Sequence, residues 1–227
     1  SKIYIDKTGL IEYTNSVLDT SDAYICNSRP RRFGKSYTAN MLAAYYSKGC
    51  NSEEMFSGLD ISRKSDFKTH LNQYDVIHID IQWFLANCYN SNKIVSFLSD
   101  SVISELRDIY PDILPLGELS LPDSLSRIKD KTGQKFIIII DEWDVLIRDE
   151  ATNYYIQNEY INFLRGMFKG TEPTKYIQLA YLTGILPIKK EKTQSAVNNL
   201  EEFTMLHSYE LAPYIGFTEN EVKMLCQ

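Results

Sequence analysis

The sequence predicts an α/β fold in which a parallel sheet carries helices on both faces. Short apolar runs of strand length alternate along the chain with longer segments whose apolar residues recur at helical spacing. The run 136–140 is apolar throughout, which is typical of a parallel strand buried on both faces. Polar residues gather where the apolar runs stop, and parallel sheets bind their ligands at that edge.

The first third of the chain predicts two helices around one strand. Residues 10–18 have apolar positions at helical spacing, and Thr8 before them is a candidate N-cap. Residues 23–26 form a short apolar run before a glycine-bearing turn and predict a strand. Residues 35–48 are rich in good helix formers, and Gly49 is a natural C-terminal stop.

The rest of the chain continues the alternation. Period-2 and uniformly apolar runs predict strands, while apolar residues three and four apart predict helices. The three prolines within 111–122 indicate a loop. The expected strands are 76–81, 136–140 and 175–183, and the expected helices are 93–109 (ended by Pro111), 121–131, 156–168 and one starting near Thr218.

Composition indicates an ordinary soluble globular chain of one large domain, or one domain plus a fragment. The 227 residues are 44% hydrophobic and 24% charged, and the net charge of −6 argues against dominant non-specific nucleic-acid binding. No run approaches the roughly 18 apolar residues of a membrane span, and the N-terminus has no apolar signal core. The four cysteines form no C-x-x-C pair, so we expect neither a zinc site nor a disulfide framework, and a cytoplasmic setting.

A basic loop follows the first expected strand and opens a helix. It reads Arg29-Pro30-Arg31-Arg32-Phe33-Gly34-Lys35-Ser36, whose end matches the G-x-x-x-x-G-K-[ST] phosphate-binding loop, or P-loop. Backbone N–H groups and the helix dipole attract phosphate there, Lys35 can reach the β- and γ-phosphates, and Ser36 can ligate Mg²⁺. Arg29 replaces the first glycine of the pattern. A basic surface turn beside an ordinary helix remains the alternative.

A pair of carboxylates follows the apolar run 136–140. A buried strand that delivers Asp141 toward a P-loop is the Walker B arrangement, in which the aspartate holds Mg²⁺ opposite Ser36. Glu142, one residue later, would orient and polarise an attacking water. Paired acids after a strand are also common in turns, but two such constellations in the right order are much more specific than either alone.

Three further groups of residues are candidates with weaker signals. Thr183 and Gly184 close the last apolar run, where a polar side chain could contact the γ-phosphate or the water. His78 and Asp80 share one face of a strand. A hydrogen-bonded polar pair is the commoner role for such residues, metal binding is an alternative, and Asp80 could also form a second layer around the site. Arg148 and Arg165 are candidate arginine fingers, although surface or ion-pair roles are commoner for arginines on helices.

Five motifs along the chain resemble the bacterial AAA-ATPase-like family. The arginine at position 29 fits this resemblance, because the family uses Arg where most P-loops use Gly. The resemblance extends over nearly the whole chain. The motifs are Tyr4-Ile5-Asp6-Lys7-Thr8, the loop Arg29 to Ser36, Asp141-Glu142-Trp143-Asp144, Leu182-Thr183-Gly184 and Ile215-Gly216-Phe217-Thr218.

The resemblance implies an additional-strand P-loop ATPase fold, similar to AAA and signal-transducing ATPases. It also implies a catalytic Glu142, a Thr183 of the sensor-1 type, and a segment around Asp6 that could lie over the adenine. Residues 1–205 would be the ATPase domain, and 206–227 the truncated start of a helical lid or linker. Members typically carry a PD-(D/E)XK nuclease-like domain after the ATPase; that domain is expected to be absent from this chain, which has no matching D…(D/E)-x-K pair.

We therefore expect Mg-dependent ATP binding and hydrolysis that drives or gates a conformational change. A nucleotide-sensing module with little turnover is one alternative, and a phosphotransferase using the loop 114–123 as a lid is a weaker one. Oligomeric state, including a homo-oligomer, nucleic acid as a partner, and ATP over GTP stay open. The expected catalytic residues are Glu142, Lys35 and Thr183, the nucleotide-binding residues are Arg29, Pro30, Arg31, Arg32, Phe33, Gly34, Lys35, Ser36 and Tyr37, and the Mg²⁺ ligands are Ser36 and Asp141.

Overall fold

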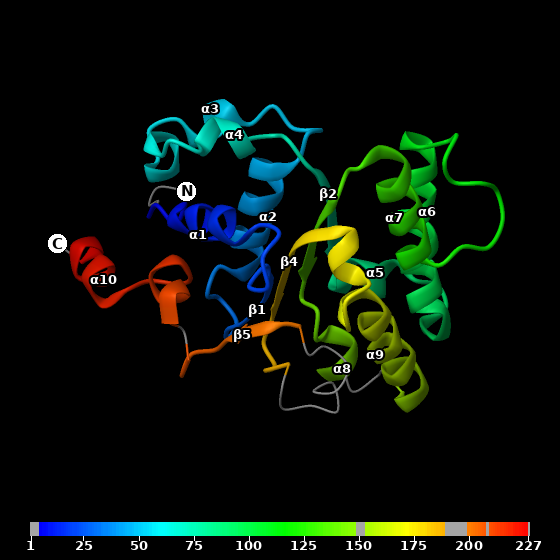
Figure 1. The fold of residues 1–227 in the computed structure, drawn as a ribbon. Coiled ribbons are helices and arrows are strands. Elements are labelled where there is room, and N and C mark those ends of the chain that lie inside the picture. Colours follow the sequence, from blue (N-terminus) through cyan, green and yellow to red (C-terminus); the bar gives the residue numbers. More distant parts are fainter. Residues whose placement is uncertain (1–4, 149–152, 189–198, 208, 227) are drawn as a thin grey trace.

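A parallel β-sheet forms the centre of the computed structural model, which describes residues 5–148, 153–188, 199–207 and 209–226 (Figure 1). Within these ranges the sheet has five strands in the order β2-β3-β4-β1-β5. The fold class expected from the sequence is therefore confirmed. The strands are β1 (Tyr24–Ser28), β2 (Asp75–Asp80), β3 (Phe136–Asp141), β4 (Ile177–Gly184) and β5 (Glu201–Phe203).

The strand order places β4 between the strand that precedes the basic loop and the strand that delivers the carboxylates. β1 pairs with β4 so that Ser28 lies opposite Gly184, while β2 pairs with β3 so that Asp80 lies opposite Asp141. Every pairing is parallel. The polar residues that follow β1, β3 and β4 therefore meet at one edge of the sheet, as the sequence pattern indicated.

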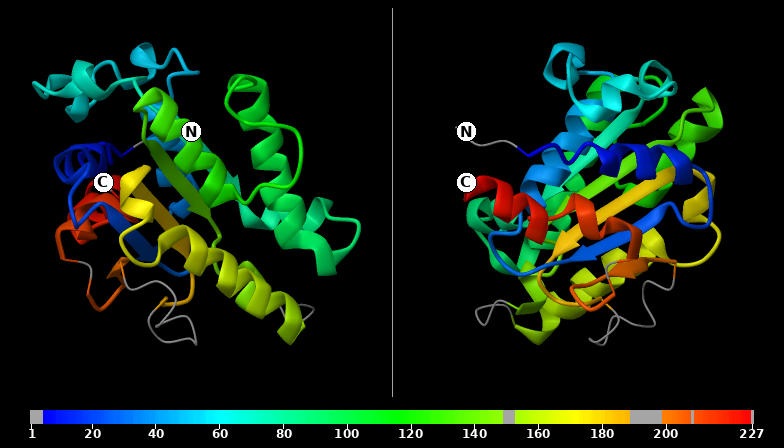
Figure 2. Two further views of the ribbon diagram at one scale, coloured as in Figure 1. Left: turned by 45° about the vertical axis from the view of Figure 1, so that its right-hand side comes forward. Right: turned by 90° about the vertical axis from the view of Figure 1, so that its left-hand side faces the viewer.

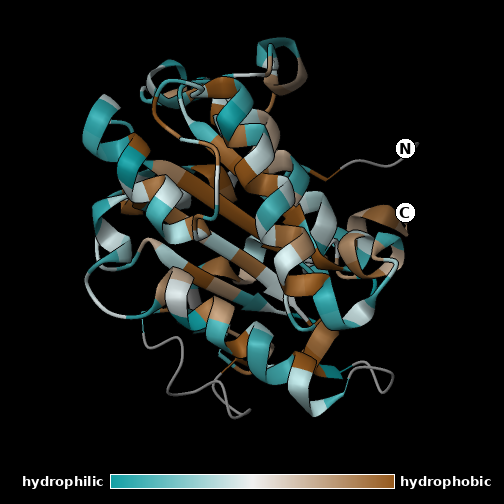
Figure 3. Ribbon diagram, turned by 90° about the vertical axis from the view of Figure 1, so that its right-hand side faces the viewer, coloured by the Kyte–Doolittle hydropathy of each residue, from teal (hydrophilic) through white to brown (hydrophobic). Residues whose placement is uncertain are grey.

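Helices cover both faces of the sheet. α1 and α2 lie on one side, and α6, α7 and α9 lie on the other, with polar residues on their outer faces and apolar strands beneath them (Figures 1 and 3). In the described ranges, short 3₁₀ helices cover 60–63, 91–93, 173–175 and 209–214. The α-helices are α1 (Gly9–Val17), α2 (Lys35–Tyr46), α3 (Glu53–Phe56), α4 (Phe67–His70), α5 (Ile81–Asn87), α6 (Ile94–Ile109), α7 (Leu121–Thr132), α8 (Val145–Arg148), α9 (Tyr154–Phe168) and α10 (Glu219–Leu225).

The ends of one helix and one strand show how the structure departs from the predicted bounds. α2 ends at Tyr46 rather than at residue 48, because Ser47 is already extended and forms a parallel bridge with Tyr74. The strand expected to include Ile81 ends at Asp80, whose side chain accepts a 3.1 Å hydrogen bond from the Trp83 N–H and so caps α5. Short polar side chains that bond nearby N–H groups end a strand and begin a helix in this way.

The core consists mainly of the central strands and the inner faces of the helices. All residues of β1, β3 and β4 are buried, whereas β2, at the sheet edge, alternates. Two adjacent tyrosines of α2 fix the layer above the sheet: the Tyr46 hydroxyl donates to Asn15 at 2.8 Å, and the Tyr45 hydroxyl donates to the Phe67 carbonyl at 2.9 Å. These bonds hold α1 and the segment around α4 against the helix that follows the basic loop.

The N-terminal and C-terminal segments lie side by side (Figure 2). Lys7 Nζ donates to both carboxylate oxygens of Glu221 on α10 at 2.7 Å and to the Pro213 carbonyl at 2.7 Å. The Lys7 and Glu221 side chains are only 9% and 16% exposed. Residues more than 200 positions apart in the sequence are thus joined by a largely buried ion pair.

Candidate active site

The basic loop between β1 and α2 has the backbone shape of an anion-binding site. Arg32 and Gly34 both adopt left-handed conformations, with φ values of 69° and 76°. Alternation of right-handed and left-handed residues turns successive N–H groups toward one concave face, and the N-terminus of the twelve-residue helix α2 adds its dipole there. Lys35 Nζ lies over this loop and donates to the Pro30 carbonyl at 3.2 Å.

Arg29 is placed differently from the rest of the loop. Its side chain is buried. Nη1 donates to the Phe203 carbonyl at 2.9 Å and to the carbonyl of the preceding residue, Ser28, at 3.1 Å. Burial lowers the pKa of the guanidinium from its ordinary value. The Arg29 side chain therefore joins β1 to β5, and the Arg29 N–H donates to the Gly184 carbonyl of β4 at 3.0 Å. Arg29 thus holds the sheet together beside the loop, and neither of these donors is available to a phosphate.

The end of β3 carries a carboxylate that the next strand holds in place. Asp141 Oδ1 accepts a short hydrogen bond from the Thr183 hydroxyl and a 2.9 Å bond from the Glu142 N–H. Thr183 is fully buried, and Asp141 is 5% exposed. Both of these hydrogen bonds end on Oδ1, which leaves Oδ2 as a second oxygen that can accept a ligand.

An open cavity of about 480 Å³ brings the two constellations together. Lys35 and Ser36 reach it from the start of α2, and Asp141 and Glu142 reach it from the end of β3. The other residues that line it are Arg31, Arg32, Gly34, Tyr37, Asp80, Gln82 and Arg148. Most of the site residues expected from the sequence therefore share one cavity. Thr183 lies beneath the cavity and donates a hydrogen bond to Asp141. The Pro30 carbonyl accepts a hydrogen bond from Lys35, and Phe33 faces a neighbouring pocket.

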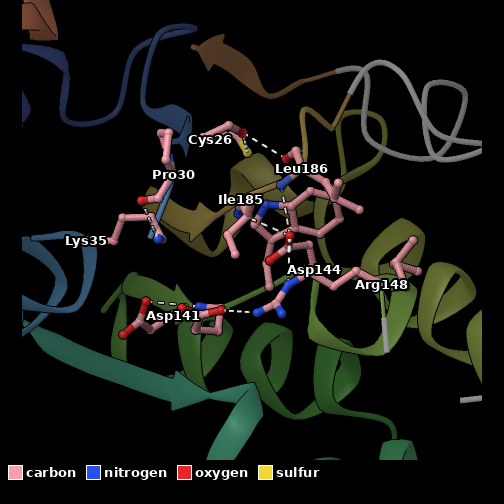
Figure 4. A network of polar contacts seen from close by, with 12 residues as sticks. Cys26, Pro30, Lys35, Asp141, Asp144, Arg148, Ile185 and Leu186 are labelled. Carbon is pink, nitrogen blue, oxygen red and sulfur yellow. Dashed lines mark hydrogen bonds and ion pairs between the residues drawn. The ribbon is translucent and has the colours of Figure 1, made fainter. Parts of the chain in front are cut away.

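Glu142 sits in a strained backbone conformation and in an ion pair. Its φ is 53°, which a residue with a side chain rarely adopts, and such outliers concentrate at functional sites. The Arg148 guanidinium contacts the Glu142 carboxylate through Nη2, while its Nε lies 3.2 Å from Asp144 Oδ2. Figure 4 shows Arg148 within this network, between Asp144 and the end of β3. Asp144 was named in the sequence motif, but its role in fixing Arg148 was missed.

Asp144 also shapes the chain after β4. It is fully buried, and its Oδ2 accepts hydrogen bonds from the Ile185 and Leu186 N–H groups at 3.0 and 2.8 Å. Gly184 precedes these two residues, and a Cβ atom there would lie 2.5 Å from Trp143 Nε1. Only glycine fits this approach. The Thr-Gly pair thus has two roles, since the threonine fixes Asp141 and the glycine lets β4 pass Trp143.

A second pocket, of about 310 Å³, adjoins the charged cavity and shares Arg32, Gly34 and Tyr37 with it. Its walls include four aromatic residues and come from three distant parts of the chain. The residues that line only this pocket are Ile5, Lys7, Phe33, Thr38, Tyr214, Gly216 and Phe217. Gly216 has a φ of 79°, and a Cβ there would lie 2.8 Å from Phe33. We call this site the aromatic pocket. The sequence analysis did not predict it as a pocket, although it expected the segment around Asp6 to lie over the adenine and named Phe33, Gly34 and Tyr37 as nucleotide-binding residues. Gly216 and Phe217 belong to one of the motifs that carried the resemblance.

A buried polar cluster supports the helix that bears Lys35. The Tyr181 hydroxyl on β4 contacts Thr38 on α2 and accepts from Asn27 on β1, each at 3.1 Å. Burial raises the pKa of Tyr181 to about 12, so it stays neutral and can make both bonds. The chain has sixteen tyrosines, and no sequence signal distinguished Tyr181 from the other fifteen.

The remaining candidates lie outside the charged cavity or have local roles in it. His78 is exposed, and the Asp80 side chain caps α5, so the two do not pair in the way the shared face suggested. Arg165 donates to Asn162 on its own helix at 2.6 Å. Among the residues that the structure describes, no group of three or more His, Cys, Asp or Glu side chains could hold a metal ion by itself, and no helix is long and apolar enough to cross a membrane.

Comparison with known proteins gives one family and one relative. A family model described as "Predicted AAA-ATPase" matches residues 1–193, which is most of the chain. An "Uncharacterized protein in vnfD 5'region" from Azotobacter chroococcum mcd 1 is 23% identical over 236 residues. That alignment covers 96% of this chain and 40% of the relative, so the chain spans less than half of the relative's length.

Proposed function

Since the chain belongs to the predicted AAA-ATPase family, we propose that it binds Mg-ATP and hydrolyses it at the carboxyl edge of the sheet. The observation that carries this proposal is the single cavity that Lys35, Ser36, Asp141 and Glu142 line together. The loop from Arg31 to Ser36 would bind the phosphates through its N–H groups, and Lys35 would exchange the Pro30 carbonyl for phosphate oxygens.

The residues present fit a magnesium ion bound with nucleotide. Mg²⁺ takes oxygen ligands, often one or two from the protein, with waters and substrate phosphates supplying the rest. The exposed Ser36 hydroxyl and Asp141 Oδ2 meet this requirement in one cavity, with Thr183 holding the other carboxylate oxygen. When bound, the ion would neutralise charge that develops on the phosphate oxygens.

Glu142 is the residue proposed to act on water. Its carboxylate would accept the proton of a water whose oxygen bonds to the γ-phosphorus, while the bond from that phosphorus to the ADP oxygen breaks, giving ADP and phosphate. The rate gain would come from positioning and electrostatics rather than from covalent chemistry on the protein.

The aromatic pocket is proposed to hold the nucleotide base. It adjoins the phosphate loop at Gly34, and Phe33, Tyr37, Tyr214 and Phe217 provide flat faces on which a base can stack. Residues 1–205 would then be the ATPase domain, and 206–227 would begin a lid or linker that reads the bound state. Hydrolysis would drive or gate a change in an attached or partner domain.

Phosphate release from Mg-ATP, measured beside nucleotide binding, tests this proposal. We expect Glu142→Gln to lower phosphate release about 100- to 10,000-fold while still binding ATP, because only the group that accepts the proton is lost. Glu118→Gln, which changes an exposed glutamate in the loop before α7, is the matched control and should behave as wild type. Full phosphate release by Glu142→Gln would contradict the assigned role.

One observation favours a second candidate, a nucleotide-sensing module with little turnover. Glu142 is held by Arg148 through Oε2, so in this conformation its carboxylate is tied into an ion pair. A wild-type chain that binds ATP and ADP but releases no phosphate would support this alternative over hydrolysis.

A further inference from the structure

The pairing of Arg148 with Glu142 has a consequence for the proposed reaction, on which this inference rests. Arg148 lines the same cavity as Lys35, Ser36 and Asp141, and its side chain is 21% exposed. We propose that Arg148 is the chain's own γ-phosphate-binding arginine, held by the Glu142 carboxylate until an ATP γ-phosphate replaces that carboxylate.

The anchoring of Arg148 supports such an exchange. Asp144 is fully buried, accepts two backbone hydrogen bonds and lies 3.2 Å from Arg148 Nε. Nε therefore stays beside a fixed carboxylate, while Nη2 contacts Glu142, a residue that lines the cavity together with Arg148. An arginine presents several donors in one plane, so one edge can stay anchored while the other changes partner.

The competition between two anions decides which partner Arg148 takes. The Glu142 carboxylate carries one negative charge on a strained backbone, with φ at 53°. A γ-phosphate carries more charge and three oxygens, and it would arrive beside Lys35 in the same cavity. Once Arg148 contacts phosphate, Glu142 is released to accept a proton from water. One movement thus completes the charge stabilisation and frees the base.

ADP has no γ-phosphate, so only ATP can draw Arg148 away from Glu142. The exchange therefore predicts that Arg148 contributes to ATP affinity and not to ADP affinity. Direct binding of ADP and of a non-hydrolysable ATP analogue, measured by calorimetry, separates the two. For Arg148→Gln we expect analogue affinity to fall about tenfold and ADP affinity to change by less than about twofold.

Two further variants sharpen the test. In Glu142→Gln a neutral amide replaces the carboxylate that holds Arg148, so analogue affinity should rise several-fold, and the rise should vanish in the double variant with Arg148→Gln. Arg148→Lys, which keeps a charge but loses the planar fork, should recover part of the lost affinity. Arg127→Gln, on the exposed face of α7, is the matched control.

Phosphate release gives the second readout. Arg148→Gln should lower it about 1000-fold, as expected when an arginine that contacts the transferring phosphate is removed. Unchanged analogue affinity in Arg148→Gln, or faster phosphate release, would overturn this inference alone and leave Arg148 as a restraint on Glu142. Failure of the wild-type chain to bind either nucleotide would instead overturn the proposed function, and this inference with it.

Discussion

The charged cavity and the aromatic pocket lie on either side of Gly34 and are built in different ways. The charged cavity takes its key side chains from two short stretches, each directly after a strand. The aromatic pocket takes its walls from residues near positions 5, 33 and 215, which the fold brings together. At the sheet edge, residues that are close together in the sequence thus form the charged cavity proposed to bind the phosphates. The site proposed for the base depends instead on how the two ends of the chain pack.

The two regions also differ in what holds them. In the charged cavity, the strained Glu142 pairs with Arg148 of α8, and its neighbour Asp141 accepts a hydrogen bond from Thr183 of β4. The aromatic pocket is closed by van der Waals contacts, such as Phe33 against Gly216, and by the ion pair of Lys7 with Glu221. Changes in the first region should therefore act on phosphate binding and catalysis, and changes in the second on affinity for the base.

The largest effect should come from Lys35→Met in the charged cavity. The Lys35 ammonium is nearly buried beside the phosphate loop, so its loss removes charge that both ATP and inorganic triphosphate need. We expect the affinity for each to fall about 100-fold, consistent with the loss of a strong charge-assisted contact of about 3 kcal/mol. Calorimetric titration of both ligands measures this.

Lys131→Met, at the exposed end of α7, provides the matched control for Lys35→Met. It removes the same charge from the chain and should leave both affinities unchanged. Loss of ATP affinity with retained triphosphate affinity in Lys35→Met would contradict the division between the two regions, because Lys35 would then act on the base side.

A smaller and more selective effect should follow Phe217→Ala in the aromatic pocket. Its ring is 62% exposed, so stacking on a base would contribute at the lower end of its usual range. We expect ATP affinity to fall about tenfold and triphosphate affinity to stay within about twofold of wild type. Tyr89→Ala, which removes an exposed aromatic ring outside the pocket, is the control.

An equal loss of affinity for ATP and for triphosphate in Phe217→Ala would contradict the proposed division of labour between the two regions. It would mean that the ring supports the phosphate loop through Phe33 and Gly216 rather than contacting a base. Titration with GTP beside ATP adds the base preference, which the sequence left open.

The central sheet and the charged cavity could be predicted from the sequence because their signals are local. Uniformly apolar runs such as 136–140 mark buried parallel strands, and residues that follow β1 and β3 line the charged cavity. The strand β5 was missed since Glu201–Phe203 is only three residues long and is held in the sheet by pairing with β1. Its position also decides where the Arg29 side chain points.

The aromatic pocket could not be predicted because it depends on tertiary contacts. A tyrosine or phenylalanine at positions 33, 214 or 217 reads equally well as core or surface until the chain ends are placed. Arg148 was named as a candidate from its type alone, although its partners Glu142 and Asp144 lie only six and four residues before it. Its pairing with Glu142 depends on the turn after β3, where Glu142 has a φ of 53°, and the sequence does not reveal that turn.

The smallest effect concerns the ion pair that closes the aromatic pocket. Burial raises the pKa of Glu221, but the hydrogen bonds from Lys7 and Thr218 outweigh it, so the net pKa lies below its ordinary value. A carboxylate with a lowered pKa stabilises the fold above its unfolded pKa and loses that contribution as the pH falls through its folded pKa. Glu221→Gln should therefore lower the melting temperature by about 2–4 °C at neutral pH, and the difference should shrink as the solution becomes strongly acidic.

Lys7→Met should show the same loss at neutral pH, because it removes the other partner. Both variants should weaken ATP binding slightly while leaving triphosphate binding intact. A difference in melting temperature that stays constant down to strongly acidic pH would mean that the Glu221 side chain stabilises α10 through its capping bond with Thr218 alone.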